Sequence, residues 1–393
     1  MKHLKTIFYA LKGLFAAFFL FSATPLRAEI ADSVIASMDS VEISLLTCAP
    51  HDEVYSLYGH TAIRYHDLRS GGIDAAFNYG VFNFHAPYFT LRFVFGITDY
   101  ELGAYPYRFF EKEYRHFGSE VIEQVLNLTN EEKLLLRSAL AENLKPENTV
   151  YRYNYFYNNC TTKARDIIEQ CVNGKMEYAD NKSHTTTYRQ SVRAMTQRNP
   201  WAQFGNDFLL GIKADQPTTA RQQEFLPANL MHDFDHAQIL ENGVARPLVK
   251  ERRVAVPAGA QMTQEGFPLS PLACGILLLV ACLILFVIEW RSHRIFLLLD
   301  IVLMVVTGTL GIVLFLMLFS QHPTVSLNLQ FLLFNPLPWF FLWPVSKGRK
   351  TPYWKITIVL AVFFLIGGIF QSYAEGLWCL ALCLLLQSYI HIK

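Results

Sequence analysis

The sequence has no excess of charge of either sign, because its 393 residues include 34 Lys and Arg against 33 Asp and Glu. Such a chain produces no overall basic field, which argues against nucleic acid as a partner. The sequence also lacks a serine nucleophile-elbow motif and a phosphate-binding glycine loop. Neither internal repeats nor low-complexity segments occur. These absences leave a protein for which we expect no cofactor.

Hydrophobic residues make up 52% of the sequence, and they are concentrated at its two ends. The N-terminus has three early lysines, an apolar run over residues 14–21, and the small residue Ala28 before Glu29. This order predicts a Sec-type signal peptide over residues 1–28. An uncleaved membrane anchor is the alternative, although the apolar run is short for a membrane span.

The C-terminal part, residues 270–393, contains five apolar runs, of which the third is short and interrupted by proline. They predict a five-helix transmembrane domain. Basic residues lie in its first and third loops: Arg291, Arg294, Lys347, Arg349, Lys350 and Lys355. By the positive-inside rule these loops face the cytoplasm. We therefore expect a multi-pass protein of the cell inner membrane, with a periplasmic domain over residues 29–245 and a polar linker over 246–269.

The predicted periplasmic domain mixes strand and helix patterns. Alternating or aromatic-rich stretches predict strands over residues 53–65, 75–84, 120–129 and 149–157. Thr129 and Glu132 are spaced as a capping box for a helix that Pro146 ends. A second helical spacing of apolar residues begins just after Cys160. The expected class of this domain is α+β.

Three of the seven cysteines, Cys48, Cys160 and Cys171, lie in this domain. Cys160 precedes a predicted helix start, where unpaired amides and the helix dipole favour a thiolate and a developing oxyanion. This position predicts a nucleophile. An odd number of cysteines in an oxidising compartment leaves at least one thiol free. Cys171 is expected in the core, and Cys48 remains a rival nucleophile or a disulfide partner.

A cysteine nucleophile needs a base, and His60 is our candidate because it follows Gly59 on the polar face of a predicted strand. A structural histidine is the alternative. Asn78, with Asn83 behind it, is expected to orient the imidazole ring. Weaker candidates for contacts to the substrate or the oxyanion are Asn159, Tyr58, Tyr155, His322 and Asn328. The last two lie near the third membrane helix, where they would satisfy broken backbone or line a lipid-access cavity.

His232 and His236 are the strongest candidates for a metal site. On a helix, residues four apart share a face and two imidazoles there suit zinc. No third ligand follows at a convincing spacing, so we expect no metal.

The order of His60 before Cys160 reverses that of ordinary papain. It resembles the circularly permuted papain-like proteins, such as the lecithin–retinol acyltransferase relatives and the NlpC/P60-like hydrolases. The segments "TCAPHDEVYSLYGHTAIRY", "FNYGVFNF" and "YNYFYNNCTTKARDII", followed by five apolar runs, are similar to the Lnb family of lipoprotein N-acyltransferases. The resemblance covers nearly all of the mature chain, although His51 stands where a glycine is expected.

This resemblance implies transfer of a fatty acyl chain through a thioester on Cys160, with His60 as the base. The acceptor would be the α-amino group of the N-terminal cysteine of a diacylated lipoprotein. The donor would be a membrane phospholipid or a lipoprotein, at the surface of the lipid bilayer. Two other classes stay open: a membrane-anchored cysteine peptidase or amidase acting on peptidoglycan or peptides, and a non-enzymatic binding module with a Cys48–Cys160 disulfide.

Overall fold

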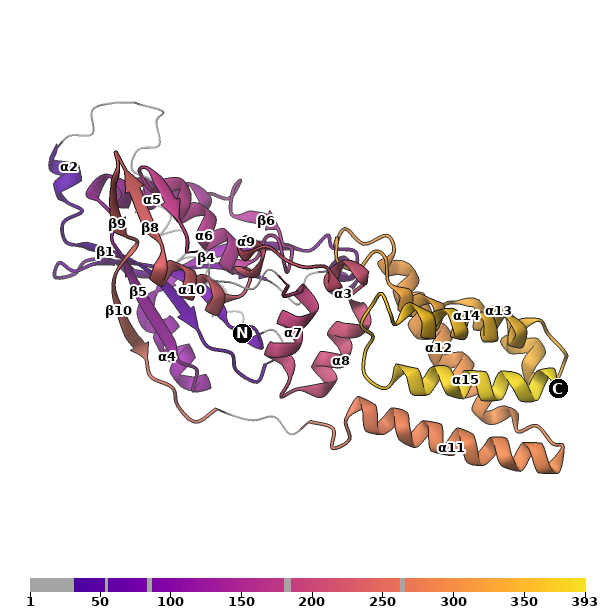
Figure 1. Cartoon of the computed structure of the whole chain (residues 1–393). Helices are drawn as coiled ribbons and strands as arrows, with labels where there is room; N and C mark the ends of the chain where they lie inside the picture. The colour runs from indigo at the N-terminus through magenta and orange to yellow at the C-terminus, as the bar shows by residue number, and fades with distance from the viewer. Residues whose placement is uncertain (1–31, 54–55, 83–86, 180–184, 262–265) are drawn as a thin grey trace. The chain divides into compact units, whose positions relative to one another are not determined.

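The computed structural model describes residues 32–53, 56–82, 87–179, 185–261 and 266–393. The predicted signal peptide and Asn83 lie outside these residues. The chain divides into two compact units, whose elements are drawn in Figure 1. Of the described residues, those within 32–89, 97–179 and 218–261 form a sheet unit, and those within 90–96, 185–217 and 266–393 form a helical unit.

The sheet unit is built on a seven-stranded antiparallel sheet. Its strands, in spatial order, are β10 (Val249–Val256), β5 (Val121–Leu126), β1 (Val41–Cys48), β2 (His60–Asp67), β3 (Asp74–Val81), β4 (Asp99–Pro106) and β6 (Val150–Arg152). A smaller sheet pairs β7 (Lys175–Glu177), β8 (Gln238–Glu241) and β9 (Val244–Pro247). Short helices α2 (Asp32–Ala36) and α9 (Ala220–Gln223) complete this unit together with the helices below.

Helices cover both faces of the large sheet. On one face, α5 (Asn130–Asn143), α6 (Cys160–Cys171) and α10 (Pro227–His236) enclose the main core. On the other face, α4 (Tyr107–Phe117) packs over a second apolar cluster. Successive residues of a strand point to opposite faces, so Ile63 enters the first core and its neighbour Ala62 the second. The central strands are therefore apolar on both sides.

Several local predictions for this unit agree with the structure, although the strand expected over residues 53–65 begins only at His60. The capping box is present, because Thr129 Oγ1 accepts from the Glu132 amide and the Glu132 carboxylate accepts from the Thr129 amide. The sheet-rich unit confirms the mixed class of α and β structure. The strand expected over 149–157 is shorter, since β6 ends at Arg152 and the chain then turns through Asn154 and Asn158.

The linker expected over residues 246–269 is wrong in its first half. Residues 249–256 form β10, which pairs with β5 at the edge of the large sheet. The polar composition that indicated a linker belongs to an edge strand, and its arginines are paired: Arg253 contacts both Glu123 and Glu42. Charged side chains are common on edge strands because they discourage pairing with other chains.

The helical unit contains five α-helices after residue 265: α11 (Pro271–Ser292), α12 (Leu297–Met317), α13 (Leu337–Ser346), α14 (Tyr353–Gly367) and α15 (Leu377–Ile392), with the 3-10 turn η3 (Leu329–Leu332). Among the described residues, α11 and α12 are long and apolar enough to cross a membrane, and α14 and α15 are shorter apolar helices. The ten residues of α13 rise only about 15 Å, half the thickness of a bilayer core.

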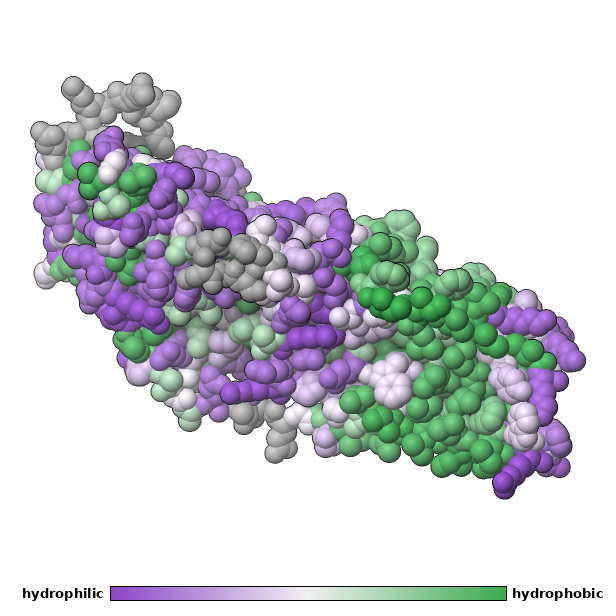
Figure 2. Space-filling view, viewed as in Figure 1, coloured by the Kyte–Doolittle hydropathy of each residue, from purple (hydrophilic) through white to green (hydrophobic). Residues whose placement is uncertain are grey.

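The surface of the helical unit agrees with a membrane environment. Figure 2 shows hydrophobic residues over the visible face of helices α11–α15, whereas hydrophilic residues prevail over the sheet unit. Exposed apolar side chains on these helices include Leu277, Ile284, Leu298, Val359 and Phe363. Apolar surface of this extent needs a partner, and a lipid bilayer provides one.

Residues 185–217 group with the helical unit, although the sequence led us to expect one domain over residues 29–245. They form α7 (Tyr188–Thr196), α8 (Pro200–Leu209) and the 3-10 turn η2 (Ile212–Asp215), and they pack with the membrane helices. A short apolar helix, α3 (Phe89–Val94), leads from β3 into the helical unit and the chain returns to β4. Both segments lack long apolar runs, so composition assigned them to the soluble part.

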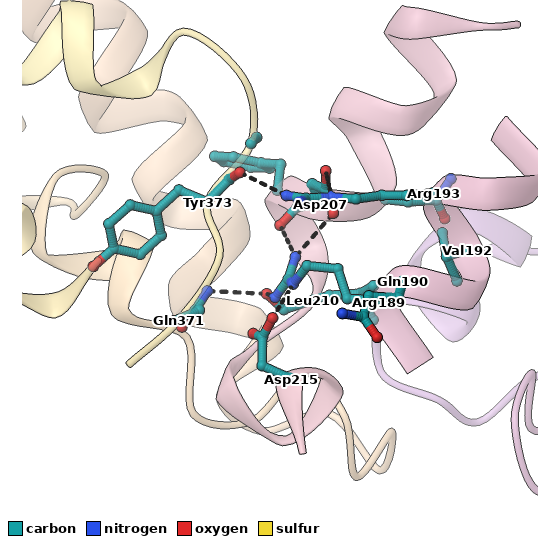
Figure 3. A network of polar contacts seen from close by, with 12 residues as sticks. Arg189, Gln190, Val192, Arg193, Asp207, Leu210, Asp215, Gln371 and Tyr373 are labelled. Carbon is teal, nitrogen blue, oxygen red and sulfur yellow. Dashed lines mark hydrogen bonds and ion pairs between the residues drawn. The ribbon is translucent and has the colours of Figure 1, made fainter. Parts of the chain in front are cut away.

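A buried arginine cluster holds residues 185–217 in place (Figure 3). The fully buried Arg189 donates to Asp207, to Asp215 and to the carbonyl oxygens of Leu210 and Gly211. Arg193 bonds the second carboxylate oxygen of Asp207 at 2.8 Å and the carbonyl of Tyr373, which precedes α15, at 3.0 Å. These contacts link α7 and α8 to the membrane helices.

Candidate active site

Cys160 is the first residue of α6, as its spacing from the later apolar residues predicted. The Asn159 side chain caps this helix by accepting from the Thr161 and Thr162 amides at 3.0 and 2.9 Å. A hydrogen bond of 3.1 Å between the hydroxyls of Thr61 and Thr161 fixes the first turn to β2. The nucleophile candidate is therefore held rigidly at a helix N-terminus, against the strand that begins at His60.

His60 meets Cys160 at the start of β2. Its ring lies close enough to the Cys160 sulfur for each group to shift the pKa of the other by charge and hydrogen bonding, and its Nε2 lies 3.0 Å from Asn78 Oδ1 on β3. Because Nε2 faces Asn78, the nitrogen left for the sulfur is Nδ1. The residue before His60 must be glycine for the chain to enter β2 at this point. Gly59 has a φ of +77°, and a Cβ there would lie 2.5 Å from the Cys48 carbonyl oxygen. The structure thus brings together Cys160, His60 and Asn78, in that order.

The electrostatics of the pair favour a thiolate and an imidazolium. Burial raises the pKa of Cys160, but His60, the Thr61 amide and the Thr161 hydroxyl outweigh it and lower the pKa to about 7. Burial lowers the pKa of His60, but Cys160 and Asn78 outweigh it and the net pKa is raised. A thiolate near neutral pH is the reactive form of a cysteine nucleophile. Both side chains are half-buried, so the pair stays accessible.

The rival roles of Cys48 and the expected role of Cys171 are settled by their surroundings. All seven cysteines are free, so Cys48 and Cys160 form no disulfide. Cys48 is 1% exposed and its burial raises the pKa of its thiol well above the ordinary range. Such a thiol is a poor nucleophile. Cys171 lies in the main core, as expected.

Three weaker candidates lie in the sheet unit. Asn159 does not provide a free donor, because its Nδ2 already donates to the carbonyls of Tyr155 and Phe225 at 3.0 and 2.8 Å. Tyr58 and Tyr155 lie side by side, with ring centroids 4.9 Å apart and the rings edge to face.

The two membrane-side candidates, His322 and Asn328, lie in the helical unit. His322 Nε2 lies 3.1 Å from the carbonyl oxygen of Phe93. Asn328 is buried, donates to the Phe208 carbonyl at 2.8 Å, and accepts from the Gln330 amide and from Gln371 Nε2. Of the two roles considered for such residues, these contacts of Asn328 fit the first, satisfying irregular backbone.

His232 and His236 share one side of α10, with ring centroids 4.6 Å apart. His236 Nδ1 donates to the His232 carbonyl oxygen at 2.8 Å, which uses one of the four ring nitrogens. In the described part of the chain, no three His, Cys, Asp or Glu side chains are grouped to hold a metal ion.

Two residues near the pair were missed in the sequence. Glu113 on α4 lies within electrostatic range of His60 and helps to raise the pKa of that imidazole. Tyr151 on β6 lies beside Cys160, across Gly80. Glu113 carries no motif that marks it. Tyr151 belongs to a run of alternate tyrosines at 151, 153, 155 and 157, in which spacing alone selects no member.

Comparison with protein families matches both parts of the chain. Residues 27–194 match the model of the Lnb N-terminal periplasmic domain, and residues 262–393 match that of the Lnb transmembrane domain. The chain belongs to the Lnb family. Its two domains make it a membrane protein with a periplasmic domain, and indicate a membrane-associated periplasmic enzyme of the Lnb family. Comparison with curated proteins and with solved structures gave no match.

Proposed function

We propose that this Lnb-family protein is a lipoprotein N-acyltransferase that uses Cys160 as its nucleophile. The observation that carries the proposal is the placement of Cys160 at a helix start beside His60, which Asn78 orients and which helps to lower the thiol pKa to about 7, in a periplasmic domain joined to membrane helices. Lipid donors and lipoprotein acceptors both lie at the membrane surface. The bilayer therefore supplies both substrates to one site.

The fold of the sheet unit supports the same class of chemistry. A cysteine at a helix start packs against an antiparallel sheet, with histidine on the second strand of the sheet segment and asparagine on the third. We infer that the unit is a circularly permuted papain-like domain, in which the histidine strand precedes the nucleophile helix. Asn78 then holds the His60 ring toward the sulfur, the role that a third polar group has in such sites.

The reaction proceeds in two acyl transfers. The Cys160 thiolate attacks the ester carbonyl of a phospholipid or lipoprotein donor, and protonated His60 gives its proton to the leaving alkoxide. A thioester on Cys160 results. The α-amino group of the N-terminal cysteine of a diacylated lipoprotein then attacks the thioester, His60 accepts a proton from the amine, and the thiolate leaves with an amide as product.

The membrane part sets where this chemistry takes place. The basic loops of residues 291–294 and 347–355 would face the cytoplasm, which puts the sheet unit on the opposite side. We infer a multi-pass protein of the inner membrane in which all five helices after residue 265, including the short α13, contribute to the bundle. The acyl donor would then come from the outer leaflet of that membrane.

The deciding experiment expresses Cys160→Ala in a bacterial strain that lacks its own lipoprotein N-acyltransferase. Mass spectrometry of lipoprotein N-terminal peptides should show N-acylation with the wild-type protein and none with the variant. The matched control is Cys171→Ala, at the far end of the same helix, which should keep N-acylation. Unchanged N-acylation with Cys160→Ala would refute the proposal, and newly cleaved muropeptides without N-acylation would identify a peptidoglycan amidase instead.

A further inference from the structure

Tyr151 on β6 has a rigidly held ring next to the nucleophile. Its ring lies edge-on to that of Tyr79 on β3, with centroids 6.1 Å apart. Lys163 Nζ on α6 lies 4.9 Å from the centroid of the Tyr151 ring. The ring thus has neighbours on both the strand that carries Asn78 and the helix that begins at Cys160. Such contacts leave the hydroxyl little freedom to reorient.

The Tyr151 hydroxyl lies against the same backbone as Cys160. Gly80 has a φ of +90°, and a Cβ built on it would lie 3.8 Å from Cys160 Cβ and 3.8 Å from Tyr151 Oη. Cys160 and the Tyr151 hydroxyl therefore both border the position that a side chain at Gly80 would occupy. The absence of a side chain at Gly80 leaves that position open.

The Tyr151 hydroxyl is buried, yet it donates to no acceptor within the residues that the structure describes. The Tyr79 hydroxyl, in contrast, accepts from Asn143 Nδ2 at 2.8 Å. A buried donor without an acceptor is costly and calls for an explanation, and at a catalytic site a substrate atom supplies one.

We propose that the Tyr151 hydroxyl, above Gly80, forms an oxyanion site that takes the carbonyl oxygen of an ester or thioester substrate. This inference rests on the proposed function. When the Cys160 sulfur bonds to the carbonyl carbon, the π-bond electrons move to the oxygen, and Tyr151 donates a hydrogen bond to that oxygen without transferring its proton. Collapse restores the carbonyl, and the leaving alkoxide takes its proton from His60.

The same site serves the second acyl transfer. The amine attacks the thioester carbonyl, the negative charge again develops on its oxygen, and Tyr151 again donates to it. Collapse then expels the Cys160 thiolate. Tyr151 is therefore assigned a role in both steps, whereas His60 exchanges protons with the leaving alcohol in the first step and with the amine in the second.

The test compares Tyr151→Phe with Tyr79→Phe in the full-length protein in detergent micelles. The first reaction is the burst of p-nitrophenolate released when p-nitrophenyl butyrate acylates Cys160, which passes through an oxyanion. The second is alkylation of Cys160 by iodoacetamide, which forms no oxyanion. Removal of one oxyanion donor typically slows acylation about 10²- to 10³-fold.

We expect Tyr151→Phe to show this loss in the burst rate while its alkylation rate stays within about threefold of the wild type. Tyr79→Phe, which loses a hydroxyl bonded elsewhere in the same cluster, should leave both rates unchanged. Equal losses of acylation and alkylation in Tyr151→Phe would overturn the assignment, because they would show a displaced sulfur. A burst rate like that of the wild type, or no burst in the wild type, would also overturn it.

The proposed function and this inference fail separately. If the wild-type protein shows the burst and Tyr151→Phe loses it, the oxyanion site stands even when no lipoprotein becomes N-acylated in cells. If lipoproteins are N-acylated equally by the wild type and by Tyr151→Phe, the function stands and the oxyanion site does not.

Discussion

The Cys160 site and the Arg189 cluster are both built from buried polar side chains, but their hydrogen bonds are satisfied to different degrees. All three guanidinium nitrogens of Arg189 have acceptors. Near Cys160, Asn78 Nδ2 and the Tyr151 hydroxyl have no partner among the described residues. Donors that meet acceptors stabilise a fold, whereas unsatisfied donors cost stability unless a ligand meets them. The Arg189 cluster therefore serves structure, and the unsatisfied donors near Cys160 fit the role in chemistry that we propose.

This difference makes the effects of substitution separable. Changes near Cys160 should alter the rate or its pH dependence while leaving stability nearly unchanged. Changes near Arg189 should alter the free energy of unfolding while leaving the reactivity of the Cys160 thiol intact. A variant that affected both equally would contradict the division.

The largest effect is expected for His60→Ala, which removes both the base and the positive charge beside the thiolate. Acyl transfer should fall about 10³-fold, within the usual range for loss of a general acid–base group. The pKa of Cys160 should rise from about 7, and the pH dependence of iodoacetamide alkylation measures it. His66→Ala, on the same strand, is the control; an unchanged thiol pKa in His60→Ala would show that the pair is not coupled.

Arg189→Met should have the next largest effect, on stability alone. Removing the Arg189 guanidinium leaves the buried negative charges of Asp207 and Asp215 less well compensated. The loss of one partner of a buried ion pair costs about 3–5 kcal/mol in the free energy of unfolding. Thermal unfolding in detergent micelles measures the change. Arg115→Met removes an exposed pair with Glu111 and should cost no more than about 1 kcal/mol. Similar shifts in the two variants would contradict the structural role of the cluster.

Asn78→Ala should reduce the rate without abolishing it. The His60 ring loses the acceptor at 3.0 Å that orients it, and loss of such an orienting partner typically costs about 10- to 100-fold. Asn78 also raises the pKa of His60, so the alkaline limb of the pH–rate profile should move to lower pH. Rates of acyl transfer across the pH range test both effects, and an alkaline limb that does not move would argue against the Asn78 contact.

The smallest effect is the pH dependence of the wild-type enzyme. The reactive form has Cys160 deprotonated and His60 protonated, so activity should rise as pH passes the thiol pKa of about 7 and fall above the raised pKa of His60. The apparent pKa values of both limbs of the pH–rate profile belong to the Cys160–His60 pair as a whole. At about pH 6 the rate should be roughly tenfold below its plateau. An acid limb near pH 9, the range of an unperturbed thiol, would contradict the pairing.

Much of the fold was predictable from local patterns. The helix that begins at Cys160, the capping box at Thr129 and the apolar runs after residue 270 were each read from neighbouring residues. The pairing of His60 with Cys160 and Asn78 was also inferred from the strands and the helix on which they lie. These inferences succeed because backbone periodicity and helix capping depend on residues within a few positions of each other.

Other features depend on segments that are far apart in the chain. The sequence alone predicted the nucleophile, its helix and the membrane runs, since each is encoded in a short stretch. The tertiary structure alone placed the Tyr151 hydroxyl and Cys160 against Gly80, placed residues 249–256 beside β5, and joined residues 185–217 to the membrane helices. In each of these cases the deciding contact is made with a distant segment, and a local pattern carries no information about which distant segment it will meet.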